Sequence, residues 1–314
     1  MSSAPLTADQ IKAVKGDGFL HNRGTRQFSG RIITENGILK ANQMAALAQA
    51  AEQYGNGNIS FTVRLTVEVP GIEYENIQPF KALIAAVGMQ TGGTGSKVRP
   101  VVACKGTTCV FGLYDTQQMA MEIHQRFYEG YRGVTLPHKF KIAVGGCPNN
   151  CVKPDLNDLG IVGQRIPQID YDACRGCKQC GVVQACPVYA VALQDGTINI
   201  DPSLCINCGR CIGTCPFQIA NSFEDRYKIY VGGKWGKSVR CGSPLDALFT
   251  KEEALNVVEK AILLFKSEGV SGERFGQTCD RLGMEKVNKM LASDRLLRHK
   301  EGILDIQTAA GAKC

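Results

Sequence analysis

The cysteines are the residues of this sequence best suited to chemistry, because fifteen occur among 314 residues and most recur at short spacing. Residues 174–187 read CRGCKQCGVVQACP, and residues 205–216 read CINCGRCIGTCP. The second run matches the C-x2-C-x2-C-x3-C-P spacing of bacterial proteins that bind [4Fe–4S] clusters. The first run has the same three leading cysteines but two more residues before its final Cys-Pro. Together they predict a two-cluster ferredoxin module over about residues 166–220.

The ligand sets of these two clusters follow from a rule of such modules, in which the fourth cysteine of each run binds the cluster of the other run. One cluster is expected on Cys174, Cys177, Cys180 and Cys215. The other is expected on Cys205, Cys208, Cys211 and Cys186. Two zinc sites are the alternative, but eight cysteines in two runs of this kind favour iron–sulfur clusters.

A further set of four cysteines lies outside the module: Cys104 with Cys109, and Cys147 with Cys151. Each pair follows a predicted strand, and four thiolates from two loops suit a third [4Fe–4S] cluster. A structural zinc ion and buried free thiols are the alternatives. Cys241, Cys279 and Cys314 have no partner at ligand spacing, so free or buried thiols are expected there.

Four cations stand on the strands predicted near this second set. Lys139 and Lys141 are two residues apart, so on a strand they share one face, about 7 Å apart along the chain. Arg31 and Arg64 lie among apolar residues of two other predicted strands. A solvated strand edge or a simple ion pair is the plainest explanation of such cations. Their proximity to cluster ligands instead indicates a bound oxyanion or polyanion.

The elements that must position these residues form an α+β pattern. Alternating or β-branched residues predict strands at 28–34, 59–69, 101–104, 139–144 and 227–231. Helical periodicity predicts helices at 41–53, 76–87, 115–129, 251–269 and 284–292. The stretch TGGTGSKVRP at 91–100 marks a boundary. We therefore expect a β-α-β-α unit over about 20–90, followed by a larger α+β unit that the ferredoxin module interrupts.

Composition excludes several classes of function. A net charge of +7, from 36 basic and 29 acidic residues, is too mild and dispersed to indicate nucleic-acid binding. No apolar run is long enough to span a membrane, and the first residues have no pattern of a secretory signal. Cysteines at this spacing without a signal indicate metal ligation rather than disulfides, and we expect a cytoplasmic protein.

Taken together, these segments resemble the siroheme-dependent sulfite and nitrite reductase family, most closely its small anaerobic (dissimilatory-type) sulfite reductase C subunit with an inserted two-cluster ferredoxin domain. The resemblance covers nearly the whole chain. It rests on the paired cysteines and on the segments KGDGFL (15–20), FSGRI (28–32), TVRLTVEVPGI (62–72), LPHKFK (136–141) and GERFG (272–276). It implies a ferredoxin-like half domain at 1–95, a siroheme and [4Fe–4S] domain at 96–165 and 221–314, and the insertion at 166–220.

The resemblance also implies roles for single residues. Cys151 would bridge the third cluster to the siroheme iron, and Arg31, Arg64, Lys139 and Lys141 would form the catalytic pocket for the anion. Siroheme carries many carboxylates, so further cations are expected around it, with the candidates Arg23, Arg26, Lys97, Arg99 and Lys105. Asn149 would either donate a hydrogen bond to the site or only form the turn between two ligands.

Two features depart from the family pattern. The first cysteine pair is C-x4-C where the family usually has C-x5-C, which leaves the geometry of that loop open. Larger members contain two copies of the repeat, and one active site takes its lysines and its cluster cysteines from different copies. This chain contains one copy, so we expect a homodimer or larger assembly in which Lys139 and Lys141 of one subunit face the haem held by Cys151 of the other.

The activity implied by the resemblance is the six-electron reduction of sulfite to sulfide, with electrons relayed through the inserted module. Ammonia-forming nitrite reduction is one alternative. An electron-transfer subunit that carries clusters but no haem is another. No G-x-G-x-x-G follows a predicted strand, so the expected donor is a reduced ferredoxin or a partner subunit that oxidises NAD(P)H.

Overall fold

A small antiparallel sheet forms the N-terminal part of the computed structural model, which describes residues 6–307. Its strands are β1 (Phe19–His21), β2 (Gln27–Ile32), β3 (Ser60–Phe61) and β4 (Val67–Glu73), in the order β1-β2-β4-β3. The helices beside it are α1 (Ala8–Lys15), α2 (Ala41–Tyr54) and α3 (Ile77–Ala85), the last preceded by the short turn η1 (Tyr74–Asn76). Burial alternates along β2, so Phe28 and Ile32 enter the core while Arg31 points to the opposite face.

The predicted strand at 59–69 is wrong, because the chain reverses within it. β3 ends at Phe61, and β4 pairs antiparallel to it with Phe61 opposite Val67. The hydroxyls of Thr62 and Thr66 are 2.7 Å apart, and Leu65 has a positive φ of 58°. Arg64 therefore lies at the tip of a hairpin rather than inside a strand.

A mixed five-stranded sheet forms the centre of the molecule, in the order β11-β10-β7-β6-β5. Its strands are β5 (Val102–Ala103), β6 (Ile142–Gly145), β7 (Leu159–Gln168), β10 (Ser222–Val231) and β11 (Ser243–Phe249). β5, β6 and β7 run parallel, whereas β10 and β11 are antiparallel to their neighbours. β6 begins later than the predicted strand at 139–144, so Lys139 and Lys141 lie in the segment that leads into it.

Helices from both halves of the sequence pack on this sheet. α4 (Thr116–Ile123) packs against β5 and β6 and continues as a π-helical segment, η3 (His124–Glu129), which completes the predicted helix at 115–129. α6 (Lys251–Glu268) is mostly buried and begins with a capping box between Thr250 and Glu253. Four shorter helices follow it: α7 (Phe275–Leu282), α8 (Met284–Ala292), α9 (Arg295–Arg298) and α10 (Lys300–Leu304).

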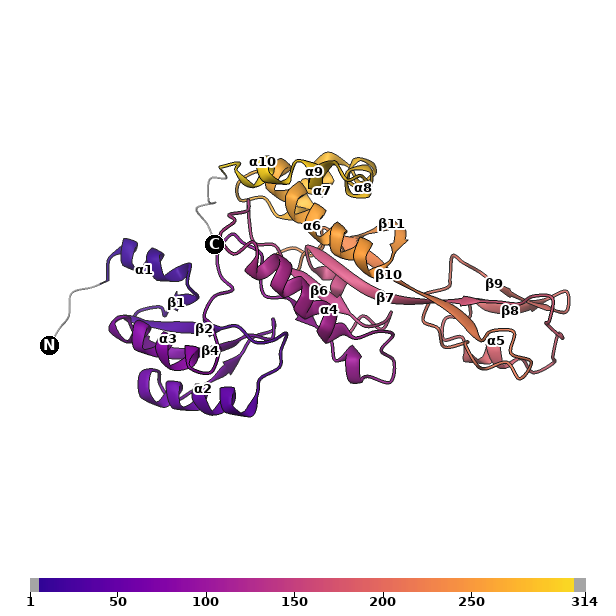
Figure 1. The fold of residues 1–314 in the computed structure, drawn as a ribbon, viewed down its shortest axis with the longest axis horizontal. Coiled ribbons are helices and arrows are strands. Elements are labelled where there is room, and N and C mark those ends of the chain that lie inside the picture. Colours follow the sequence, from indigo (N-terminus) through magenta and orange to yellow (C-terminus); the bar gives the residue numbers. More distant parts are fainter. Residues whose placement is uncertain (1–5, 308–314) are drawn as a thin grey trace.

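The segment predicted to be a ferredoxin module, and called the ferredoxin module below, stands at the end of a two-stranded ribbon. β7 and β10 pair without interruption from Leu159 and Val231 to Gln168 and Ser222, and they extend beyond the body of the molecule (Figure 1). The module contains α5 (Gly181–Ala185), β8 (Val191–Gln194) and β9 (Thr197–Ile200). Its small core includes Val182, Ile198 and Ile219, with cysteines packed around them. Within residues 6–307 no helix is long and apolar enough to cross a membrane.

Candidate active site and metal centres

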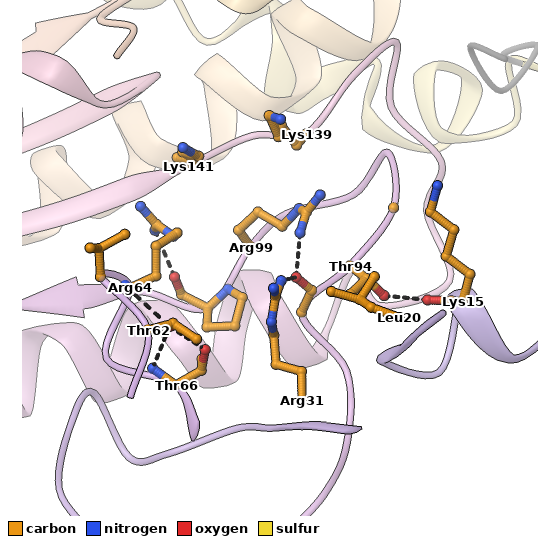
Figure 2. Close-up of a pocket in the computed structure, with 14 residues that line it drawn as sticks. Lys15, Leu20, Arg31, Thr62, Arg64, Thr66, Thr94, Arg99, Lys139 and Lys141 are labelled. Carbon is orange, nitrogen blue, oxygen red and sulfur yellow. Dashed lines mark hydrogen bonds between the residues drawn. The ribbon is translucent and has the colours of Figure 1, made fainter. Parts of the chain in front are cut away.

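A cavity of about 350 Å³ gathers the four cations singled out in the sequence. Arg31 comes from β2, Arg64 from the β3–β4 hairpin, and Lys139 and Lys141 from the segment before β6 (Figure 2). Lys15 and Arg99 also line the cavity, and none of the described lining residues is acidic. Six positive charges around one cavity repel one another. The cavity therefore favours an anionic ligand that neutralises them.

Arg31 is held rigidly at the floor of this cavity. It lies directly opposite Glu68 on β4, and its guanidinium donates to that carboxylate at 2.5 and 2.8 Å. Arg31 also donates to the carbonyl of Gly93 at 3.2 Å, and Arg99 donates to the same carbonyl (Figure 2). One backbone oxygen thus draws two guanidinium groups together.

Arg64 ties the N-terminal hairpin to the central sheet. Its guanidinium donates to Asn157 Oδ1 at 2.9 Å and to the carbonyls of Pro100 and Ile142 at 2.8 and 3.2 Å. Burial, opposed by the charge of Asp158, lowers the pKa of Arg64 to about 10. The buried Nε has no hydrogen-bond partner in the protein, so this arginine keeps one donor for a ligand.

The two lysines stand in a strongly positive environment. Burial lowers the pKa of Lys141 to about 8, and the charge of Arg64 adds to the effect. The Lys139 backbone N–H donates to His138 Nδ1 at 2.7 Å. Burial lowers the pKa of His138 to about 4, and Lys139 adds to this shift, so the imidazole is neutral at physiological pH.

A buried ion pair supports the segment that carries Lys139 and Lys141. Asp158, which is fully buried, accepts the Lys141 backbone N–H at 2.9 Å. Arg274 donates to both oxygens of Asp158, at 2.8 and 2.7 Å. Sequence reasoning missed this pair because 116 residues separate its members. It also missed Asn157 and Lys15. The signals that the sequence offers are the polar Asn157-Asp158 before β7 and the place of Lys15 at the end of α1 and the start of the KGDGFL segment.

The four cysteines of the second set lie in the loops that follow β5 and β6. Cys104 follows β5, Cys109 follows the short turn η2 (Gly106–Thr108), and Cys147 follows β6. Burial raises the pKa of the Cys147 thiol, and the nearby thiols of Cys104, Cys151 and Cys109 raise it further, while the Asn149 backbone N–H lowers it. A thiol in such a place becomes a thiolate most readily when positively charged iron binds it.

Two glycines allow these cysteine loops to touch. A Cβ on Gly146 would lie 3.1 Å from the Gly106 Cα and 3.4 Å from the Cys104 sulfur. The Gly146 backbone N–H donates to the Cys104 sulfur at 3.2 Å. Cys151 is the exposed member of the four cysteines. Across residues 6–307, no group of three or more Cys, His, Asp or Glu side chains is arranged around a single metal ion.

Four of the cysteines expected to hold a ferredoxin cluster lie close together in the structure. Cys186, Cys205, Cys208 and Cys211 all line one small cavity within the module. Burial raises the pKa of the Cys211 thiol to about 11, and the other three thiols add to the shift. Of the other set, Cys174, Cys180 and Cys215 pack around the same small core. These donor sets fit iron–sulfur clusters, which take thiolate ligands.

The remaining predicted residues are more scattered. Arg23 is exposed in the β1–β2 turn, and Arg26 in the same turn pairs with Glu75 at 3.0 Å. Lys105 is exposed beside Cys104, and Lys97 is half-buried. Among the described residues that line the cation cavity, Arg99 is the one member of this group. Cys241 is exposed and Cys279 is buried, as expected of free thiols, whereas Cys314 lies outside the described residues.

Two family profiles match this chain. The nitrite/sulfite reductase ferredoxin-like half domain matches residues 21–87, and the nitrite and sulphite reductase 4Fe-4S domain matches residues 94–300. Among solved structures, dissimilatory sulfite reductase I superposes with a TM-score of 0.67 at 22% identity, over 92% of this chain and 73% of that chain. The likeness confirms the predicted α+β fold.

Relatives found by sequence similarity are also named as sulfite reductases. The chain is 32% identical over 265 residues to the coenzyme F420-dependent sulfite reductase of Methanocaldococcus jannaschii, covering 82% of this chain but only 42% of that protein. It is 30% identical over 270 residues to the C subunit of the anaerobic sulfite reductase of Salmonella typhimurium, covering 80% of this chain and 77% of that one. With a profile matched over more than half of its length and these relatives, the chain belongs to the nitrite and sulfite reductase family.

Proposed function

We propose that the chain is the catalytic subunit of a sulfite reductase that converts sulfite to sulfide with six electrons. The observation that carries the proposal is the cavity where Arg31, Arg64, Lys139 and Lys141 converge. Two relatives named as sulfite reductases, from an archaeon and a bacterium, support sulfite rather than nitrite as the substrate.

The cofactors of this proposal are siroheme and three [4Fe–4S] clusters. Siroheme coupled to the cluster on Cys104, Cys109, Cys147 and Cys151 would supply the iron that binds sulfur and the electrons that reduce it. The cation cavity suits an anionic group, whether a siroheme carboxylate or the oxyanion, because cations line it and Arg64 keeps a buried donor without a protein partner. The two ferredoxin clusters would complete the set.

Within the cavity the cations have two kinds of role. Arg31 is fixed by Glu68 and by the Gly93 carbonyl, so it acts as a permanent charge that orients the anion. Reduction to sulfide removes three oxygens as water, so protons must arrive with the electrons. Lys141 is suited to hold and deliver such protons, because a pKa of about 8 leaves it protonated at neutral pH yet able to give up its proton.

The active site of this proposal is shared between two copies of the chain. None of the four thiols of Cys104, Cys109, Cys147 and Cys151 is among the described residues lining the cation cavity. Lys141 precedes β6 and Cys147 follows it, and a strand of four residues rises about 13 Å. We therefore propose a homodimer in which Lys139 and Lys141 of each subunit face the haem held by Cys151 of the other.

A complementation experiment tests this sharing. Neither a Lys139→Ala chain nor a Cys151→Ala chain alone has a complete site. When the two chains are mixed and reassembled, one of the two sites in the heterodimer combines wild-type Lys139 from one chain with wild-type Cys151 from the other. Activity should therefore return in the heterodimer. No recovery in a verified heterodimer would show that each chain builds its own site.

Electrons would reach the catalytic cluster through the inserted module, from a reduced ferredoxin or from a partner subunit that oxidises NAD(P)H. We place the enzyme in the cytoplasm of an anaerobe, because thiolate-ligated clusters with exposed ligands are oxidised easily. Mixing the reduced, purified donor with the enzyme and following cluster absorbance anaerobically identifies the donor.

The decisive assay is anaerobic turnover with a reduced viologen, comparing kcat/KM for sulfite and nitrite while sulfide and ammonia are quantified. The proposal predicts a clear preference for sulfite and release of sulfide without stalled intermediates. A preference for nitrite would assign ammonia-forming nitrite reduction instead. Inactivity toward both, in protein with full iron content, would leave an electron-transfer subunit as the better account.

A further inference from the structure

A second cavity, of about 530 Å³, joins the ferredoxin module to the loops of the catalytic cysteines. Cys147 and Asn149 line it from the body of the molecule, and Ile206 and Cys208 line it from the module. Ligands expected for two different clusters therefore face one space. None of Cys174, Cys177, Cys180 and Cys215 is among the described residues around this cavity.

Arg165 lines the same cavity and contacts every part that meets there. It lies on β7, where the ribbon leaves the central sheet, and is paired in register with Asp225 on β10. Its backbone N–H donates to the Asn207 carbonyl of the module at 2.7 Å. Its guanidinium donates to the carbonyl of Leu113, in the loop after Cys109, at 3.2 Å.

The rest of the Arg165 side chain is fixed as well. The guanidinium is bonded to both oxygens of Asp225 at 2.7 and 2.8 Å and lies 4.1 Å from the centre of the Phe223 ring. Module backbone lies close against its stem, since a Cβ on Gly209 would be 2.9 Å from the Arg165 side chain. A two-stranded ribbon is marginally stable alone, so such a cross-link is needed to fix the direction of the module.

We propose that Arg165 is a positioning residue that fixes the order of the electron relay, a proposal that rests on the proposed function. In this order Cys174, Cys177, Cys180 and Cys215 would hold the cluster that receives electrons from the external donor. Cys186, Cys205, Cys208 and Cys211 would hold the cluster beside the shared cavity, next to the one on Cys104, Cys109, Cys147 and Cys151. Each transfer would oxidise one cluster and reduce the next, with no bond formed or broken.

Hydrogen exchange of the cofactor-loaded chain tests the positioning role without turnover. Arg165→Ala removes the charged contacts to Leu113 and Asp225, so exchange should become roughly tenfold faster in peptides covering 109–114 and 205–211. Arg226→Ala is the matched control, because Arg226 is on the same ribbon but pairs with Glu224. Arg165→Lys should recover only part of the protection, since lysine lacks the bidentate fork. Equal exchange in the Arg165→Ala and Arg226→Ala variants would overturn the role.

Electron paramagnetic resonance tests the order of the clusters. In the reduced, loaded chain we expect magnetic coupling between the catalytic cluster and one ferredoxin cluster. Coupling should disappear in a Cys208→Ser variant and persist in a Cys177→Ser variant, with circular dichroism and iron content showing that each variant keeps its fold and its other clusters. Coupling that disappears with Cys177→Ser instead would reverse the order. Both measurements are independent of sulfite, so a failed sulfite assay and a failed relay order are distinguishable.

Discussion

Replacing Arg274 by alanine should destabilise the central unit more than any surface change of the same charge. Arg274 makes three contacts with Asp158, at 2.7, 2.8 and 3.2 Å, and the carboxylate is completely buried. Removing one member of a buried ion pair costs about 3–5 kcal/mol, because the other charge is left without a partner. Asp158 also holds the backbone of Lys141, so the lysine segment should loosen at the same time.

Native-state hydrogen exchange at β6 and β7 measures this loss of stability in the central sheet itself. A cost of 3–5 kcal/mol makes opening about 100-fold to several thousand-fold more frequent. Lys289→Ala is the control, since Lys289 pairs with Glu285 on the exposed face of α8 and should change exchange by no more than about 0.5 kcal/mol. If both variants exchange at the same rate, the reasoning about the buried pair is refuted.

The same variant should respond to pH in a defined direction. Burial raises the pKa of Asp158, and Arg274 opposes that shift, so the pKa should rise further in Arg274→Ala. A carboxyl with a raised folded-state pKa stabilises the fold below its unfolded pKa, and this contribution is lost as pH rises through the folded value. The variant should therefore approach wild-type stability at low pH, and Arg274→Ala combined with Asp158→Asn should remove the pH dependence.

Three further predictions concern the site. Lys141 is expected to deliver protons, so sulfite turnover should fall as pH rises through about 8, and a Lys141→Arg variant should lose that alkaline limb; a pH–rate profile of kcat decides this. Gly146→Ala should force apart the loops that carry Cys104 and Cys147 and lower iron and acid-labile sulfide by up to one cluster, whereas Gly133→Ala, with open space around it, should retain all iron. Chelation of iron under reducing conditions should unfold the ferredoxin module before the central unit, because its core is small and its cysteines repel as thiolates; limited proteolysis that cut the body first would contradict this.

The parts of the fold that could be predicted are those set by local pattern. The helix at 251–269 has both a capping box and a terminal glycine, and the structure places α6 there. The spacing of the cysteines at 174–187 and 205–216 is also a local pattern, and it is the basis on which a ferredoxin module is predicted. The hairpin at 62–66 could not be found in this way, because its turn contains neither Gly nor Pro and its β-branched threonines continue the strand pattern. Side-chain hydroxyls close that turn, and no periodicity reveals them.

Within the candidate site, too, some residues could be singled out from the sequence, whereas their contacts could not. Arg31, Arg64, Lys139 and Lys141 stand out as cations on strands predicted near the cysteine pairs, and resemblance gives them a role, but spacing alone could not show that they line one cavity. The pairing of Asp158 with Arg274 depends on tertiary packing across most of the central unit. Arg165 appears in sequence as an ordinary cation near the end of a strand. Its contacts come from the module, the ribbon and a cysteine loop, which only the folded chain brings together.

The register of the β7–β10 ribbon makes the inserted ferredoxin module separable from the central sheet. Gln168 and Ser222 are opposite one another at the outer end of the ribbon, so the insertion leaves and re-enters the sheet at two points about 5 Å apart. A two-residue turn spans that gap as well as the whole module does. The sheet therefore does not restrict the length or the sequence of the segment inserted between Gln168 and Ser222. A domain of another redox potential, or a simple hairpin turn, could be exchanged at this seam without repacking the core that holds the cation cavity.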